Sequence, residues 1–273
     1  MDKAKLKEAA DYVRRWAKDN PEANDLAPMF EAYYPHNIDK KSYLAKVLLE
    51  LKPWEHMSYI PNACFNHVDE LTEVVLPSGV MSIESGAFES CHNLYKVVIP
   101  DSVISIDYAA FRNCHSLNDI TLSNGIKEIC NYIFCDCRNL SSIIIPNGVH
   151  IIYNYAFLNC TSLTDVTIPN SVTNMWHENF KNCTSLSDIE IPDSVIHMGD
   201  GQFQNCSSLY YITLSKNLDG IMKNTFNGCQ SLMHINFRGT IEQWESLPIG
   251  RDAFKYVPSK TVTCSDGVTK LRH

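Results

Sequence analysis

Hydrophobic and polar positions repeat along most of this chain with a period of 23 residues. One position holds a cysteine in seven consecutive repeats, with a Phe three residues before it and a Leu three residues after it. These cysteines are Cys91, Cys114, Cys137, Cys160, Cys183, Cys206 and Cys229. An earlier copy has Phe65, Val68 and Leu71 at the same three positions. A fixed period of this length predicts a solenoid in which each repeat forms one turn.

A short alternating run follows the Leu of each repeat. In one copy Leu140, Ile143 and Ile145 are apolar, and the positions between them vary from copy to copy. Five runs end at proline, namely Pro77, Pro100, Pro146, Pro169 and Pro192. Alternation bounded by proline predicts a short strand. A second apolar pair, such as Val103 and Ile106, adds another inward-facing cluster. One turn cannot bury its own apolar face, so we expect the turns to stack and the strands to form a parallel sheet.

Residues 1–56 lack this repeat and have helical spacing instead. The apolar residues of 2–19 favour an amphipathic helix, 22–34 form a weaker helical segment, and 39–51 favour a third helix. This region is either a cap that covers the first turn or a separate partner-binding module. The predicted fold class is therefore an α+β repeat solenoid. It is a right-handed coil with one parallel sheet at 57–240, preceded by a small helical region at 1–56.

The C-terminal residues 241–273 depart from the period. The Phe expected at position 249 stands instead at Phe254. We interpret this segment as a capping repeat with a five-residue insertion. A closing strand is expected near Thr261 to Thr263.

The repeat resembles that of the BspA-like leucine-rich repeats, also called the Treponema-type class. Their motif is C-x-x-L-x-x-I-x-I-P-x-x-V-x-x-I-x-x-x-A-F-x-x-C, and Cys91 to Cys114 reads CHNLYKVVIPDSVISIDYAAFRNC. The resemblance covers about Phe65 to Phe237. It implies a leucine-rich-repeat fold and non-catalytic adhesion to proteins or recognition of them. Members of this class are often exposed on the cell surface.

Charge narrows the range of partners. Residues 1–56 hold ten Lys and Arg and ten Asp and Glu, so the whole net charge of −8 falls on the remainder. An acidic body repels phosphate backbones, so we expect no nucleic-acid partner. No apolar run is long enough to predict a membrane span. The charged start of the chain has no signal-peptide core, which favours a cytoplasmic location with reduced cysteines. A cell-surface or secreted location is the alternative, if a signal peptide was trimmed.

The variable positions of the predicted strands are the candidate binding residues. An acidic stripe consists of Asp119, Asp165, Asp188 and Glu190. An aromatic patch follows at Tyr210, Tyr211, Met233 and His234, and Tyr95 occupies an equivalent position nearer the N-terminus. Exposed aromatic residues are enriched at interface hot spots. The pattern predicts a protein partner with a basic surface, although acidic residues can simply keep a sheet soluble.

A secondary patch is predicted on another face. There Trp176 interrupts a run of smaller residues, and Tyr153 and Tyr155 lie near it in repeat position. His92 and His115 are expected to stack on adjacent turns without a carboxylate partner.

No metal or cofactor site is expected. Cys130, Cys135 and Cys137 lack a standard zinc spacing. Cys137 is also one of the seven repeated cysteines, whose side chains we expect to be buried. No known catalytic motif occurs, so we do not expect an enzyme. The leading hypothesis is an intracellular adaptor or inhibitor that binds a protein through the strand face. The alternatives are a cell-surface adhesin and a self-assembling structural protein.

Overall fold

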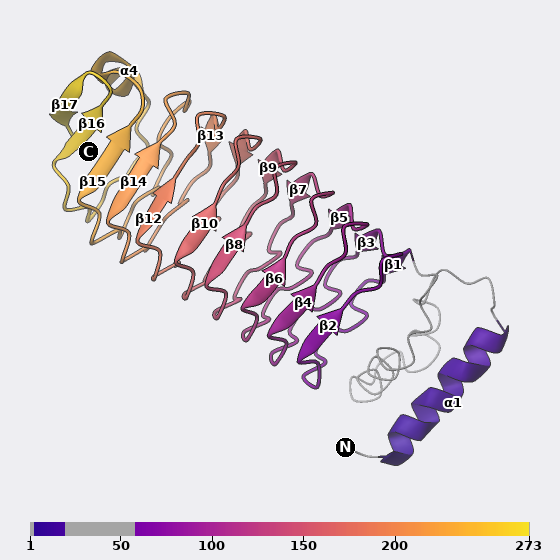
Figure 1. The fold of residues 1–273 in the computed structure, drawn as a ribbon. Helices are drawn as coiled ribbons and strands as arrows, with labels where there is room; N and C mark the ends of the chain where they lie inside the picture. Colours follow the sequence, from indigo (N-terminus) through magenta and orange to yellow (C-terminus); the bar gives the residue numbers. More distant parts are fainter. Residues whose placement is uncertain (1–2, 20–57, 273) are drawn as a thin grey trace.

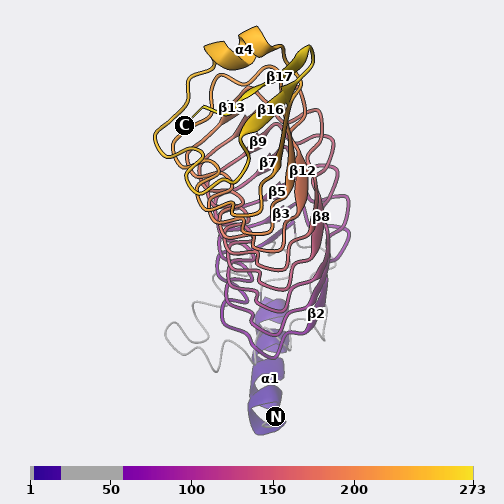
Figure 2. The ribbon, with the colours of Figure 1, turned by 90° about the vertical axis from the view of Figure 1, so that its left-hand side faces the viewer.

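The computed structural model describes residues 3–19 and 58–272. Residues 58–272 form a β-solenoid of about nine turns that contains little helix. Figure 1 shows its strands following one another in chain order, and Figure 2 shows the turns lying over one another. Helix α1 spans Lys3–Asp19, where the apolar spacing favours a helix. The helical segments expected at 22–34 and 39–51 lie outside the described residues, so the role of 1–56 stays a prediction.

A first row of parallel strands forms where the alternating runs predict it, with three or four residues per strand. We call the side of the solenoid that these strands form the strand face. Equivalent residues of successive turns are paired, so Asp188, Tyr211 and His234 lie in one line across three strands. The row consists of β2 (Glu73–Val75), β4 (Lys96–Val98), β6 (Asp119–Thr121), β8 (Ser142–Ile144), β10 (Asp165–Thr167), β12 (Asp188–Glu190), β14 (Tyr211–Leu214), β15 (His234–Phe237) and β16 (Thr261–Cys264).

A second row of parallel strands shows that the expectation of one sheet was wrong. Its strands have two residues each, and they form at the second apolar pair of each repeat, as at Ile106 and Ile129. Strands this short leave no alternation to detect in the sequence. The second row consists of β1 (Tyr59–Ile60), β3 (Ser82–Ile83), β5 (Ser105–Ile106), β7 (Glu128–Ile129), β9 (Ile151–Ile152), β11 (Asn174–Met175) and β13 (His197–Met198).

A ladder of phenylalanine rings fills the centre of the solenoid. Neighbouring rings are nearly parallel, and their centroids lie 5.0–5.8 Å apart. Phe254 stacks on Phe226 at 5.4 Å, so the ladder resumes after the five-residue insertion as predicted. The ladder consists of Phe65, Phe88, Phe111, Phe134, Phe157, Phe180, Phe203, Phe226 and Phe254, all of them buried.

The repeated cysteines lie beside this ladder and are fully buried. Each thiol donates a hydrogen bond to the carbonyl oxygen of the phenylalanine 26 residues earlier, at 3.0–3.3 Å. Cys160, for example, donates to Phe134 at 3.1 Å. Burial raises the pKa of the Cys160 thiol well above its usual value. All eleven cysteines of the chain are free thiols in the structure.

We expect the native protein to resist thiol reagents near neutral pH. Only the thiolate reacts, and burial keeps the column thiols protonated and out of contact with solvent. Cys130 is the one cysteine that is not buried. Its pKa is raised to about 12, first by burial and then by Glu128, so even this thiol should react slowly. Absorbance of the released thiol chromophore should report about one slow site in native protein and all eleven thiols in denaturant. Rapid labelling of several column cysteines would contradict the buried assignment.

The turns between strands use left-handed backbone at two positions per repeat. The residue before the cysteine has a positive φ, including +62° at Asn159, Asn182 and Asn205. Asparagine tolerates this conformation better than most residues, which accounts for its recurrence before the cysteine. The three amides form a ladder: Asn205 donates to Asn182 at 3.0 Å, and Asn182 donates to Asn159 at 2.7 Å.

The C-terminal end closes with a helix and a hairpin. The closing strand β16 pairs with β17 (Gly267–Lys270) in the antiparallel sense. The segment interpreted as a capping repeat begins with helix α4 (Ile241–Ser246). Its first turn has a capping box, in which Thr240 accepts from the Gln243 backbone and the Gln243 side chain accepts from the Thr240 backbone.

Candidate functional site

The aromatic patch predicted from the sequence forms a contiguous surface on the strand face. Tyr210, Tyr211 and Met233 are 41–51% exposed, and His234 is also exposed. The Tyr210 hydroxyl lies 3.0 Å from Nε2 of His234, within hydrogen-bonding distance. The two rings meet edge to face at 4.9 Å, and Tyr211 approaches His234 at 6.3 Å.

Strand pairing explains why these side chains meet. Tyr211 and His234 are register partners on β14 and β15, and Ile212 and Ile235 form the next pair along these strands. Side chains alternate between the two faces of a strand. The isoleucine pair is therefore buried beneath the exposed Tyr211 and His234. The backbone that carries the patch is therefore packed directly against the core.

The acidic stripe has less uncompensated charge than the sequence predicts. Asp119 forms an ion pair with Lys96 at 3.2 Å. Glu190 forms an ion pair with Arg238, which also lies 3.6 Å from Asp193.

Two carboxylates of the stripe stay uncompensated. Among the described residues, no ion pair involves Asp165 or Asp188. The hydroxyl of Ser187 donates to Asp188 at 2.8 Å. The unpaired negative charge of the stripe is therefore concentrated beside the aromatic patch.

Tyr95 does not join the aromatic patch. It is exposed on the strand face beside Lys96, at the N-terminal end of the row. Five turns separate it from the equivalent residue Tyr210, which corresponds to about 24 Å at the spacing of paired strands. A partner would have to span most of the solenoid to contact both tyrosines.

The predicted secondary patch divides into two groups. Trp176 is exposed and packs edge-on against His197 at 5.7 Å. Tyr155 instead stacks on Tyr132 at 4.7 Å, and Tyr132 contacts Tyr108 at 5.5 Å. Tyr153 is half-buried, and the charge of Glu128 is the first cause of the raised pKa of its hydroxyl.

The expectation that the stacked histidines lack a carboxylate was wrong. His92 Nδ1 lies 2.8 Å from Asp69 Oδ1, and the ring centroids of His92 and His115 are 4.8 Å apart. Burial, followed by the charge of His92, lowers the pKa of His115. In the described part of the chain, no group of three or more His, Cys, Asp or Glu side chains could hold a metal ion.

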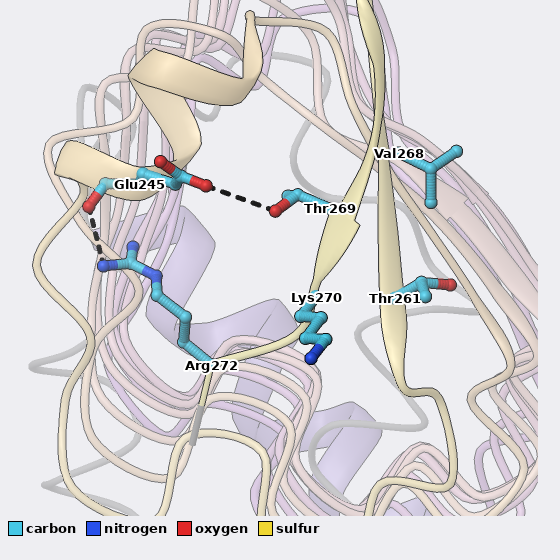
Figure 3. Close-up of a pocket in the computed structure, with 6 residues that line it drawn as sticks. All are labelled: Glu245, Thr261, Val268, Thr269, Lys270 and Arg272. Carbon is cyan, nitrogen blue, oxygen red and sulfur yellow. Dashed lines mark hydrogen bonds between the residues drawn. The ribbon is translucent and has the colours of Figure 1, made fainter.

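A hollow at the C-terminal end of the solenoid is lined by residues of α4, β16 and β17 and by Arg272 (Figure 3). The Arg272 guanidinium donates to the carbonyl oxygens of Glu245 at 2.7 Å and Leu247 at 2.9 Å, and to that of Trp244. Thr269 donates to Glu245 Oε1 at 3.3 Å. Arg272 therefore supplies hydrogen bonds to the carbonyl groups at the C-terminal end of α4, so these polar groups have a structural role. Within residues 3–19 and 58–272, no helix has the length and apolar character needed to cross a membrane.

Comparisons with known proteins agree with this architecture. The sequence model described as "BspA type Leucine rich repeat region (6 copies)" matches residues 36–163 and again 150–273. A leucine-rich repeat protein of Treponema pallidum has a similar fold, with a TM-score of 0.51 and 24% identity over 70% of this chain and 78% of its own.

A second structure, a leucine-rich repeat protein of Bacteroides ovatus, gives a TM-score of 0.49 and 24% identity over 76% of this chain and 69% of its own. No protein with a curated description matches the sequence. The match of the family model extends over more than half of the residues. The chain therefore belongs to the BspA-type leucine-rich repeat family.

Proposed function

We propose that this chain is a non-catalytic protein-recognition module whose contact site is the aromatic patch of Tyr210, Tyr211, Met233 and His234. The observation that carries the proposal is the exposure of four large side chains at the start of two paired strands, above a packed core. Tyr211 and His234 are the first residues of β14 and β15, and Tyr210 and Met233 directly precede them. Tyrosine supplies a large contact area at low cost in conformational entropy. A patch held on strands is pre-organised, so little ordering is needed when a partner binds.

The partner we propose has a basic surface around an apolar anchor. Asp188 is the register partner of Tyr211, and Asp165 lies one turn further along the strand face. Both carboxylates are exposed. They would attract a basic rim, while the tyrosines contact the apolar centre.

Replacing Tyr210 and Tyr211 together with alanine should weaken partner binding by about thirtyfold, which corresponds to the loss of a hot spot. Both side chains are exposed, so the fold should persist. The partner would be captured on the immobilised chain from lysate and identified, and its affinity for each variant would then be measured with purified protein. A matched control replaces Val75 and Ile144, two exposed strand-face residues away from the patch. Equal loss in both variants, or no loss in either, would refute the assignment.

The location we propose is the cytoplasm, where the chain acts as an adaptor or inhibitor. Eleven free thiols support this proposal, because such thiols persist most readily in a reducing compartment. Cell fractionation separates the adaptor from a surface adhesin, since the adhesin would be recovered with the envelope. Sedimentation over a range of concentrations tests the self-assembling alternative, which requires the mass to rise with concentration.

A further inference from the structure

A groove runs over the second row of strands, away from the strand face. One hollow of about 280 Å³ lies at β5 and β7, and another of about 480 Å³ lies at β1, β3 and β5. The two hollows adjoin, because Glu84, Ile104 and Ser105 line both of them. We call the two together the lateral groove.

One wall of the lateral groove is aliphatic. Met81 and Ile104 occupy equivalent positions on adjacent turns and are 50% and 59% exposed. Each stands directly before a strand of the second row, β3 or β5. The strand residues Ile83 and Ile106 are buried beneath, so the wall rests on the packed core.

Three carboxylates also line the lateral groove, among neutral side chains and one lysine. Glu84, Asp107 and Glu128 line it, and none of them takes part in an ion pair among the described residues. Ser82 donates to Glu84 at 2.7 Å and Ser85 donates to Asp107 at 2.8 Å, which holds these carboxylates in place. Among the described residues that line the hollow at β5 and β7, Lys127 is the only cation.

Two neighbouring groups respond to this negative charge. The pKa of the Tyr153 hydroxyl is raised first by Glu128. Burial is the main cause of the raised pKa of Cys130, and Glu128 and Asp107 raise it further. Asp107 and Glu128 therefore both act on the Cys130 thiol beside the groove.

We propose that the lateral groove binds a segment of a partner protein in which an arginine stands next to an aliphatic residue. A guanidinium can donate two parallel hydrogen bonds to a carboxylate, and its alkyl stem packs well on apolar surface. The aliphatic neighbour would rest on Met81 and Ile104. This surface differs from the aromatic patch in position and chemistry, so the proposal does not depend on the proposed function.

A labelled peptide tests the proposal. The probe is fluorescein-Gly-Arg-Leu-Arg-Leu-Gly, and the matched peptide has glutamate in place of both arginines. Fluorescence anisotropy at low ionic strength should show binding of the first peptide alone, weakening as salt is added. Absence of binding to the unaltered full-length chain overturns the proposal.

Matched variants locate the peptide. Asp107→Asn with Glu128→Gln should weaken binding about tenfold, because both removed charges line the groove. Asp165→Asn with Asp188→Asn removes the same charge from the strand face and should change binding less than about twofold. Equal losses in the two variants would mean general attraction to an acidic protein and overturn the proposal.

Two further variants test the rest of the assignment. Ile104→Ser should weaken binding because it removes the exposed aliphatic wall, and an unchanged affinity overturns the assigned groove. Replacing Tyr210 and Tyr211 with alanine should leave peptide binding unchanged. Loss of peptide binding in that variant would place the peptide on the strand face and overturn the proposal for the groove. The partner test of the aromatic patch is a separate measurement, so either proposal can fail alone.

Discussion

Replacing Phe157 with alanine should lower the free energy of unfolding by about 3–5 kcal/mol. The ring is fully buried between Phe134 at 5.6 Å and Phe180 at 5.3 Å. Its removal leaves a cavity and interrupts the ladder in the middle of the solenoid. Stability of a repeat array is approximately a sum of turn energies and interfaces between neighbouring turns. We therefore expect a less cooperative transition as well as a less stable protein.

Chemical denaturation followed by far-ultraviolet circular dichroism measures both effects. Ile144→Ala is the matched control, because Ile144 lies on a neighbouring turn and is mostly exposed. That variant should unfold as the unaltered protein does. A Phe157→Ala variant with undiminished stability would show that the ladder is not the main support of the core.

Replacing Gln202 with methionine should raise the free energy of unfolding by about 1–3 kcal/mol. Gln202 is fully buried, and neither its amide nitrogen nor its amide oxygen has a hydrogen-bond partner. It occupies the position that holds Ala87, Ala110 and Ala156 in other turns. A buried amide without partners incurs the cost of desolvation with no compensation. Methionine has a similar shape and no such polar group, so it should fill the same space at lower cost.

Asn179 provides the control for this substitution, one turn away at the same repeat position. Its side chain accepts from the Ala156 backbone at 3.1 Å and donates to the Trp176 carbonyl at 3.0 Å. Asn179→Leu should therefore destabilise the protein, because it removes the partner of the buried Ala156 N–H and of the partly buried Trp176 carbonyl. Thermal and denaturant unfolding of the two variants should give changes of opposite sign. Destabilisation by both substitutions would mean that Gln202 has partners, such as a buried water.

The fold was predictable wherever one residue type repeats at one position. Successive turns pair equivalent residues, so a 23-residue period places Phe226 above Phe203 without further information. The same reasoning recovered Phe254 after its insertion. The second row of strands was not recovered, because Ser105 and Ile106 alone carry no alternation. Helix α4 did leave a signal, since Thr240 and Gln243 have the spacing of a capping box.

The sequence predicted which residues of the candidate site lie side by side. It did not predict which of their charges are neutralised by ion pairs. Alignment of the repeats placed Tyr211 and His234 at equivalent positions of adjacent turns, and the strand pairing confirms that they are neighbours. Lys96 stands in the same column as Asp119, so that ion pair could have been anticipated. Arg238 could not, because its ion-pair partner Glu190 lies 48 residues earlier. The Arg238 side chain reaches a residue two turns away, and the 23-residue period does not predict such a contact.

The cysteine column also determines how the protein would age in an oxidising medium. While the turns are closed, each thiol of the column is directed to a phenylalanine carbonyl and protected by burial. Opening of two adjacent turns would return such thiols to their ordinary acidity. Cys160 and Cys183 would then be close enough along the chain to form a disulfide with any available oxidant. That bridge would remove the donor hydrogens on which both native contacts depend. The rate at which native protein is lost to oxidation would then depend on how often adjacent turns open, rather than on the equilibrium stability of the whole array.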